Sequence, residues 1–248
     1  MNLGEPVAKG NTAKIYLHEN KVYKVFNSQL PSGESLYEAT KQSYACLCGL
    51  PVPKILDIAT MDGNQVIVME YVKGRSMGDM VFENMELSEH FMNISVDVHR
   101  KIHSITPDSL EPMSDKLSRQ IEMADIDKRQ KAALLKKLET MAFDKRLCHG
   151  DFHLFNLMMD NNKVTILDWV DSSAGDIRAD VYRTYLLYSQ VSTHLANIYL
   201  KRYCSRSGLT QDEVLEWAPI IAGARLAENV STEKPERLLR IVDDYCPI

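Results

Sequence analysis

Three side chains that carry oxygen donors form the most unusual feature of the sequence. Asp151 lies within residues 147–156, Asn156 follows five residues later, and Asp168 comes twelve residues after that. A carboxylate can accept the proton of a hydroxyl group, and carboxylate and amide oxygens are suitable ligands for Mg²⁺. The same spacing of aspartate and asparagine occurs in the catalytic loop of protein kinases. The pattern predicts a phosphoryl-transfer site with Asp151 as the catalytic residue and Asn156 and Asp168 as metal ligands.

Each of these residues also has an ordinary structural interpretation. Asp151 and Asn156 are residue types that stabilise turns, and Asp168 could cap a short segment after a strand. Taken singly, each would be assigned that way. The presence of all three residues, with Asp151 and Asn156 at the spacing of a kinase catalytic loop, favours the catalytic interpretation.

The expected secondary structure changes along the chain, from mainly strands in the first seventy residues to mainly helices afterwards. Residues 13–17 and 21–26 predict a hairpin around a polar turn, and residues 54–59 and 65–71 predict a second pair of strands. Between the pairs, a helix is expected from residue 34 to about 48, ending at Gly49.

Helical periodicity dominates after a hinge at residues 72–75. One buried helical stripe is expected to contain five apolar residues: Leu87, Phe91, Ile94, Val98 and Ile102. Further helices are expected from about residue 114, at 128–142, and from 177 to the end, with interruptions at Gly208 and Pro219. A second hairpin is expected around residues 160–162.

These elements predict an α+β fold with two lobes. Residues 1–72 would form a nucleotide-binding lobe with an antiparallel sheet and one helix. Residues 73–248 would form a larger, mainly helical lobe that supplies the catalytic and substrate-binding residues. A chain of 248 residues is long enough for two lobes of this kind.

Composition narrows the classes of partner. The net charge is −5 and no basic stretch predicts binding to nucleic acid. No apolar segment approaches the roughly 20 residues of a membrane helix, and the N-terminus does not resemble a secretory signal. The five cysteines follow no common zinc or disulfide spacing. We therefore expect a cytoplasmic protein that binds neither nucleic acid nor membrane; its oligomeric state is left open.

Two segments resemble the signature of a known family. His149-Gly150-Asp151-Phe152-His153-Leu154-Phe155-Asn156, followed by Ile166-Leu167-Asp168-Trp169, is similar to the signature of the aminoglycoside phosphotransferase and choline kinase-like superfamily. These are small-molecule kinases related to protein kinases. Further similar segments follow in the same order over roughly residues 1–190, which makes the resemblance more specific than one motif would be.

The resemblance implies a set of nucleotide-binding residues. They are a phosphate-covering loop with Gly10, Asn11 and Thr12, a strand lysine at Lys24 with its partner Glu38, and a hinge containing Met69, Glu70 and Val72. The loop has one glycine where protein kinases have three. Strand alternation independently places Lys24 on the same face as Val22 and Phe26, which favours an inward lysine.

Two groups of residues outside this set, a pair of histidines and a set of C-terminal acidic residues, each have two possible interpretations. His99 and His103 are four residues apart, a spacing that can bind zinc, but no third ligand follows at a recognisable distance. A structural or hydrogen-bonding role is therefore favoured.

The acidic residues near the C-terminus could bind a cationic acceptor, but most of them are interpreted as solvated helix faces. This second group comprises Glu213, Glu216, Glu228, Glu233, Glu236, Asp243 and Asp244.

The expected activity is transfer of the γ-phosphate of Mg-ATP or Mg-GTP to a hydroxyl of a small molecule. A protein Ser/Thr kinase is one alternative, disfavoured by Asp168-Trp169-Val170 and by the lack of an Ala-Pro-Glu segment. A pseudokinase is another, disfavoured by the intact site residues. A non-catalytic helical interaction protein would require the motifs to be coincidental. The acceptor is left open among aminoglycosides, amino alcohols, sugars and other metabolites.

Overall fold

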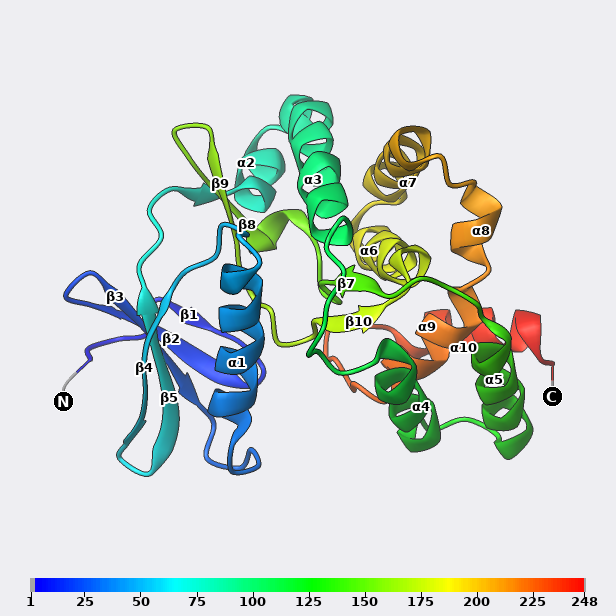
Figure 1. Cartoon of the computed structure of the whole chain (residues 1–248), viewed down its shortest axis with the longest axis horizontal. Helices are drawn as coiled ribbons and strands as arrows, with labels where there is room; N and C mark the ends of the chain where they lie inside the picture. Colours follow the sequence, from blue (N-terminus) through cyan, green and yellow to red (C-terminus); the bar gives the residue numbers. More distant parts are fainter. Residues whose placement is uncertain (1–2, 248) are drawn as a thin grey trace. The chain divides into compact units, whose positions relative to one another are not determined.

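The computed structural model describes residues 3–247, which form two compact units (Figure 1). The first unit contains the chain up to Met85 together with Leu154–Asp171. The second contains Glu86–His153 and the chain from Ser172 onward. The assignment of residues 1–72 to nucleotide binding and 73–248 to catalysis stays a prediction, because compactness does not test a binding role.

The first unit is built on an antiparallel sheet with the strand order β1-β2-β3-β5-β4. Its strands are β1 (Ala8–Lys9), β2 (Ala13–His18), β3 (Lys21–Phe26), β4 (Ile55–Met61) and β5 (Asn64–Glu70). Glu19 and Asn20 connect β2 to β3 with φ values of 48° and 59°. Two successive residues with positive φ form the turn that matches the twist of a two-residue hairpin. The predicted strand pairs are confirmed.

Helix α1 (Glu34–Leu47) covers one face of this sheet (Figure 1). It ends where the sequence predicts: the Gly49 N–H donates to Cys46 and the Leu50 N–H to Ala45, with Gly49 at φ 76°. This pair of hydrogen bonds satisfies carbonyls at the end of the helix, and the positive φ is a conformation that glycine adopts readily. The apolar core on this face contains Ala13, Phe26, Ala39, Ile67 and Met69.

A smaller three-stranded sheet completes the first unit, in the order β6-β8-β9. Its strands are β6 (Arg75–Ser76), β8 (Leu157–Asp160) and β9 (Lys163–Ile166), accompanied by α2 (Met77–Glu83) and the short helix η2 (Leu154–Asn156). A Cβ atom at Gly78 would lie 2.5 Å from the Phe155 ring, so α2 packs on η2 more closely than another residue would allow. This contact fixes the segment that ends at Asn156.

The second unit is mainly helical. Its helices are α3 (Ser88–His103), α4 (Met113–Met123), α5 (Lys128–Thr140), α6 (Ile177–Val191), α7 (Thr193–Ser207), α8 (Gln211–Leu215), α9 (Ala218–Leu226) and α10 (Pro235–Tyr245). The short helix η1 (Met85–Leu87) precedes α3, and β7 (Arg146–Cys148) pairs with β10 (Ser173–Gly175). The predicted α+β class, with an antiparallel N-terminal sheet and a mainly helical remainder, is confirmed. Within residues 3–247, none of the helices has both the length and the apolar character needed to cross a membrane.

The buried face of α3 differs from the predicted stripe. Phe91 and Ile102 are buried as expected, but Ile94 and Val98 are only half-buried. The helix packs on α7 and β7 through a face that includes His99 and His103. The buried face also contains Met92 and Val96, so the predicted stripe was rotated away from it, and the polar histidines gave no apolar signal that would correct the rotation. The two histidines are buried here because hydrogen bonds satisfy their ring nitrogens.

Candidate functional site

A buried ion pair joins the sheet of the first unit to its helix. Lys24 Nζ in β3 lies 2.5 Å from Glu38 Oε1 in α1, and the two side chains are 13% and 4% exposed. Asp168 Oδ1 lies 3.7 Å from the same nitrogen. Burial acts to lower the pKa of Lys24, but Asp168 and Glu38 outweigh burial and raise the pKa above its ordinary value. Lys24 is therefore a fixed positive charge between two carboxylates.

The β8–β9 hairpin brings Asn156 and Asp168 together at its open end. Leu157 pairs with Ile166, so the residues just outside this pair, Asn156 and Leu167, lie opposite each other. The Leu167 N–H donates to the Asn156 carbonyl at 2.8 Å, and Asp168 is the next residue. The hairpin turn is made by Asn161 and Asn162, with φ values of 46° and 65°. Backbone pairing thus sets the relative position of the two predicted metal ligands.

Asp168 combines two features that are uncommon in aspartates. Its φ is 59°, a conformation that non-glycine residues adopt rarely and that concentrates at functional sites. Its Oδ1 is buried, yet it accepts no hydrogen bond from any of residues 3–247. A buried carboxylate oxygen that accepts no hydrogen bond within residues 3–247 and lies 3.7 Å from the Lys24 ammonium group suits an additional cation. The donor set of Asp168 and Asn156 therefore fits a hard metal ion such as Mg²⁺.

These residues line one cavity of about 540 Å³, formed wholly by the first unit. Its polar groups include Lys24, Glu38, Asn156 and Asp168. Its other lining residues are mainly apolar and come from the strands, the segment after β5, α1 and α2: Val7, Ala8, Ile15, Val22, Gln42, Pro53, Met69, Glu70, Tyr71, Val72, Asp79, Met158 and Leu167. Cavities with apolar walls and a few convergent polar groups are typical of small-molecule sites. The predicted hinge residues thus lie around the same space as the predicted lysine and metal ligands.

The predicted phosphate loop lies beside this cavity but does not line it. Gly10, Asn11 and Thr12 connect β1 to β2 and are exposed. The Gly10 N–H donates to the Ala13 carbonyl at 2.9 Å, and Asn27 donates to the carbonyls of Asn11 and Thr12. The residues that flank the loop, Ala8 and Ile15, do line the cavity.

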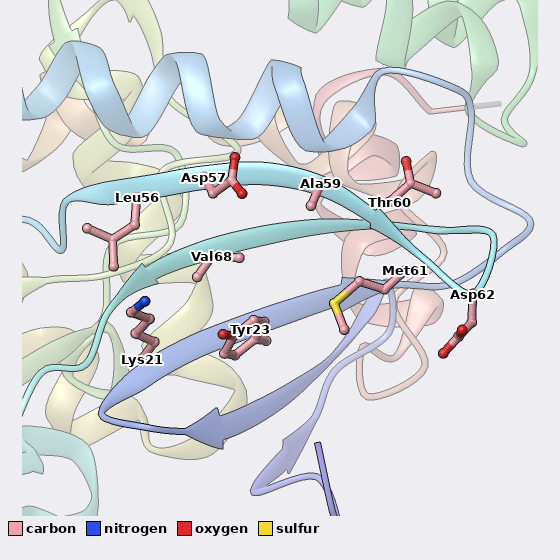
Figure 2. A pocket seen from close by; sticks show the side chains of 9 residues that line it. All are labelled: Lys21, Tyr23, Leu56, Asp57, Ala59, Thr60, Met61, Asp62 and Val68. Carbon is pink, nitrogen blue, oxygen red and sulfur yellow. The ribbon is translucent and has the colours of Figure 1, made fainter. Parts of the chain in front are cut away.

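A second hollow lies on the opposite face of the same sheet (Figure 2). Tyr23 and Val68 line it, and they alternate along their strands with residues of the α1 face. None of the predicted catalytic, nucleotide-binding or metal-binding residues lies among its lining residues. The cavity around Lys24 therefore remains the candidate site of this unit.

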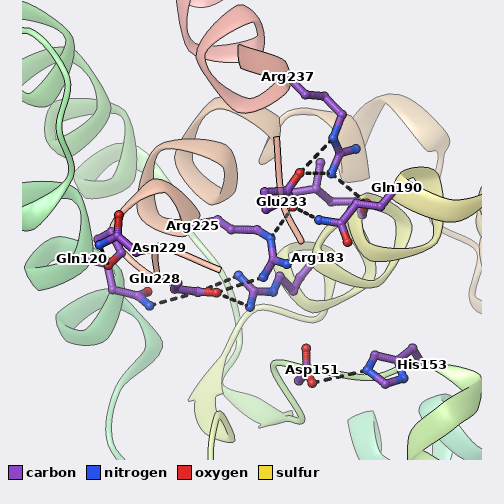
Figure 3. A network of polar contacts seen from close by, with 12 residues as sticks. Gln120, Asp151, His153, Arg183, Gln190, Arg225, Glu228, Asn229, Glu233 and Arg237 are labelled. Atoms are coloured by element: carbon purple, nitrogen blue, oxygen red, sulfur yellow. Dashed lines mark hydrogen bonds and ion pairs between the residues drawn. The ribbon is translucent and has the colours of Figure 1, made fainter. Parts of the chain in front are cut away.

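Asp151 belongs to the second unit, in the segment that follows β7. His153 Nε2 lies 3.4 Å from Asp151 Oδ2 (Figure 3). Burial alone would raise the pKa of Asp151, but the hydrogen bond with His153 and the charge of Arg183 outweigh it and hold the pKa well below its ordinary range. Asp151 is therefore ionised at neutral pH, as a proton acceptor must be.

Two of the C-terminal glutamates are not solvated helix residues as the sequence suggested. Glu228 receives both Nη atoms of Arg183 at 2.7 and 2.8 Å and is also bonded to Arg225 (Figure 3). Arg225 bridges to Glu233, which also pairs with Arg237. Because these carboxylates are already neutralised by guanidinium groups, they are poorly suited to bind a cationic acceptor.

The sequence resemblance includes Asp180, in the segment after Asp168, but gave it no partner or role. In the structure Asp180 meets both α3 histidines in the core of the second unit. His99 Nε2 lies 3.0 Å and His103 Nε2 3.1 Å from Asp180 Oδ2. The Nδ1 atoms lie 2.7 and 2.6 Å from the hydroxyls of Tyr199 and Tyr203. The spacing of the two histidines was the available signal, but their aspartate partner is about 80 residues away in sequence.

His99 gives the protein a predictable sensitivity to acid. Burial and the neighbouring His103 lower the pKa of His99 to about 3. In the unfolded chain the pKa of a histidine is about 6.5. Only the unfolded chain takes up this proton between those values, so stability is full above about pH 6.5 and declines toward pH 3. At pH 5, 1.5 units below the unfolded value, the free energy of unfolding should be about 2 kcal/mol lower than at pH 7.

Urea unfolding at several pH values checks this prediction. His99→Gln should flatten the dependence on pH between 7 and 5, because the titrating group is gone. His90→Gln, which changes an exposed histidine of the same helix, should retain it. Equal pH dependence in the wild type and His99→Gln would contradict the assignment.

Most of the sequence matches the profile of a known protein family. The sequence profile described as the phosphotransferase enzyme family matches residues 4–217. This is the kind of family that the two signature segments predict. Among curated proteins, none matches this sequence.

Several solved structures share the fold. The apo form of a thermostable mutant of aminoglycoside phosphotransferase APH(4)-Ia is 14% identical, with a TM-score of 0.71 over 98% of this chain and 95% of that one. The amicoumacin kinase hAmiN, in complex with AMP-PNP, Ca²⁺ and Ami, is 16% identical, with a TM-score of 0.64 over 98% and 88%. A choline/ethanolamine kinase family protein from Mesorhizobium loti is 14% identical, with a TM-score of 0.65 over 98% and 86%. At these identities the matches establish the fold.

Proposed function

Because the chain belongs to the phosphotransferase enzyme family, whose acceptors are alcohol groups as the sequence predicts, we propose that it transfers the γ-phosphate of Mg-ATP to a hydroxyl of a small molecule. The observation that carries this proposal is the cavity in which Lys24, Glu38, Asn156 and Asp168 converge. These residues come from three separate parts of the sequence, and each has the chemistry that a phosphate-handling site requires.

The nucleotide occupies this cavity in the proposed complex. The apolar side chains of Val22 and Met69 suit the faces of a planar base, and the backbone of Glu70 and Val72 offers groups for its hydrogen-bonding edge. Lys24 contacts the phosphates as a positive charge held by Glu38. Gly10, Asn11 and Thr12 cover the phosphates, a role supported by the resemblance of their segment and by the position of its flanking residues at the cavity.

Asn156 and Asp168 are the residues that would hold Mg²⁺. Their oxygen donors suit a hard cation, and the buried Oδ1 of Asp168 accepts no hydrogen bond within residues 3–247. A bound divalent cation would neutralise negative charge that develops on the transferred group.

Asp151 acts on the acceptor in this proposal. Its ionised carboxylate accepts a hydrogen bond from the acceptor hydroxyl, orients that oxygen toward the γ-phosphorus, and takes up the proton as the new P–O bond forms and the bond to the leaving nucleotide breaks. The nucleoside diphosphate carries away the electron pair of the broken bond. Most of the rate then comes from positioning and charge, because the chain forms no covalent intermediate.

Structural neighbours support the use of a nucleotide and of a small acceptor. One APH(4)-Ia mutant was solved with AMP-PNP and hygromycin B, and the amicoumacin kinase with AMP-PNP and Ca²⁺. We propose the same classes of ligand for this chain, with Mg²⁺ as the metal and the cytoplasm as the compartment. The experiment must identify which small molecule is the acceptor.

The test incubates the purified protein with Mg-ATP, or with Mg-GTP, and a panel of aminoglycosides, amino alcohols and sugars. The products are analysed by ³¹P NMR, which distinguishes a phosphate ester from free phosphate. At least one acceptor should yield an ester, and EDTA should abolish its formation. A parallel incubation of labelled ATP with a cell lysate separates small-molecule products from labelled protein.

Two outcomes would overturn the proposal. Label that enters protein alone would favour a protein Ser/Thr kinase. Metal-dependent nucleotide binding without transfer to any acceptor would favour a pseudokinase on the same fold.

A further inference from the structure

Helix α1 contains a lysine that is buried within the first unit. Lys41 is 4% exposed, although lysine side chains are rarely buried unless a partner holds them. Its Nζ donates to the Val170 carbonyl at 2.7 Å and lies 4.2 Å from the centre of the Tyr37 ring. A buried ammonium group has lost water, and a carbonyl and the face of an aromatic ring are groups that replace water. Lys41 therefore attaches α1 to a backbone position 129 residues away.

The carbonyl that Lys41 binds lies two residues after Asp168. On the other side, the N–H of Ile166, two residues before Asp168, donates to the Pro51 carbonyl at 2.8 Å. Pro51 belongs to the segment that follows α1. The backbone around Asp168 is thus held on one side by α1 and on the other by the chain that leaves α1.

The segment between these two attachments is a bend with an unusual conformation. Asp168 has a φ of 59°, which aspartate adopts rarely and which persists only where the surroundings hold it. The completely buried Trp169 closes the bend, because its Nε1–H donates to the Ile166 carbonyl at 3.3 Å. Release of the carbonyl that follows Trp169 would give this bend freedom to relax.

The same helix also holds the lysine of the nucleotide cavity. Glu38, three residues before Lys41 and on the same face of α1, lies 2.5 Å from Lys24 Nζ. Glu38 acts on a side chain, whereas Lys41 acts on a backbone carbonyl. One buried face of α1 therefore contacts both the Lys24 ammonium group and the bend that contains Asp168.

We propose that Lys41 is a positioning residue that holds the bend at Asp168 in the conformation that binds the metal. The part of this inference that concerns the metal rests on the proposed function; the attachment of the bend to α1 does not. Lys41 acts through the Val170 carbonyl and does not line the cavity itself. Its loss weakens metal binding, while the contact between Lys24 and Glu38 remains.

Lys41→Met tests the proposal, with Lys163→Met as the matched control. Methionine is also a long unbranched side chain, but it has no group that donates to the Val170 carbonyl. Lys163 is an exposed lysine at the start of β9, the strand that leads to Asp168. The Mg²⁺ concentration for half-maximal transfer should rise about tenfold or more in Lys41→Met, as for other residues that orient metal ligands.

A comparison of metal with nucleotide separates positioning from a general loss of structure. The Kd of Lys41→Met for metal-free ATP should stay close to the wild-type value, because Lys24 retains Glu38. Lys163→Met should match the wild type in both measurements. A wild-type Mg²⁺ requirement in folded Lys41→Met would overturn the proposal, even if urea unfolded the variant more easily, because Lys41 would then only stabilise the fold.

The tryptophans provide a measurement that does not depend on turnover. The chain has two, so the ¹⁵N spectrum contains two indole signals, and Trp169→Phe identifies them. In Lys41→Met, hydrogen exchange of the Trp169 indole should accelerate at least about tenfold. The indole of Trp217, buried in the second unit, should exchange as in the wild type. If the wild type phosphorylates no acceptor, the proposed function fails, while exchange at Trp169 still decides whether Lys41 holds the bend.

Tyr37→Leu keeps the test decisive if Lys41→Met does not fold. The variant removes the ring beside the ammonium group, and the 42% exposure of Tyr37 makes the change easy to accommodate. The Mg²⁺ requirement and the exchange of the Trp169 indole should both increase, by smaller factors than in Lys41→Met. Unchanged exchange of the Trp169 indole in the folded variants would overturn the proposal.

Discussion

Asp151→Asn is expected to lower kcat by about 10²–10⁴-fold, the usual contribution of a general base. Asparagine has nearly the same shape as aspartate and can still accept one hydrogen bond, but it cannot take up the proton of the acceptor hydroxyl. The hydrogen bond from the His149 N–H to Asp180 and the stacking of Phe152 on His99 do not involve the Asp151 side chain, so the loop should keep its structure. Nucleotide affinity should be nearly unchanged, because the proposed nucleotide residues lie in the first unit.

The measurement is initial-rate kinetics with the best acceptor of the panel, together with calorimetric titration of Mg-ATP. Asp144→Asn is a suitable control because Asp144 is an exposed aspartate of the same unit. It should behave like the wild type in both assays. If Asp151→Asn turns over at the rate of the wild type, Asp151 is not the base.

Asp168→Asn is expected to reduce phosphate transfer by about 10³-fold or more, since metal coordination contributes several kcal/mol to transition-state stabilisation. The substitution removes the charge from the proposed ligand and leaves its size unchanged. Asparagine tolerates the positive φ of this position about as well as aspartate, whereas alanine would add backbone strain. Lys24 keeps its partner Glu38 at 2.5 Å. The activity should therefore fall because metal binding is weakened, and not because Lys24 changes position.

Titration of Mg²⁺ at constant ATP separates these effects. Asp168→Asn should require far more metal for half-maximal activity, and it should bind metal-free ATP about as well as the wild type. Asp160→Asn alters an exposed aspartate in the same hairpin and serves as the control. An unchanged Mg²⁺ requirement in Asp168→Asn would exclude Asp168 as a metal ligand.

Several parts of the fold follow from short sequence segments. The predicted end of α1 at Gly49 and the turn at Glu19 and Asn20 both match the structure, because each depends on residues only a few positions apart. The approach of Asn156 to Asp168 is predictable for the same reason, since one tight hairpin connects them. The pairing of Lys24 with Glu38 came from the resemblance to a family, and strand alternation supported only the inward direction of the lysine.

Patterns that count only apolar residues were less successful in the second unit. The predicted stripe of α3 included Ile94 and Val98, which are half-buried, and omitted the buried Met92, Val96, His99 and His103. Likewise, most of the C-terminal acidic residues were interpreted as solvated, but Glu228 and Glu233 are bonded to arginines from α6, α9 and α10. A polar side chain is buried when its partners are present, and those partners are distant in sequence.

The sequence by itself led to the prediction that Asp151, Asn156 and Asp168 form a phosphate-handling motif, because that prediction depends on residue types and short spacings. Only the tertiary structure decided which groups support them. Lys24 meets Asp168 across more than a hundred residues, and Asp180 meets α3 and the loop before Asp151 through contacts that span 30 to 81 residues. Such contacts depend on how helices and strands pack. In the sequence alone, Asp180 cannot be distinguished from any other aspartate until the donors around it are known.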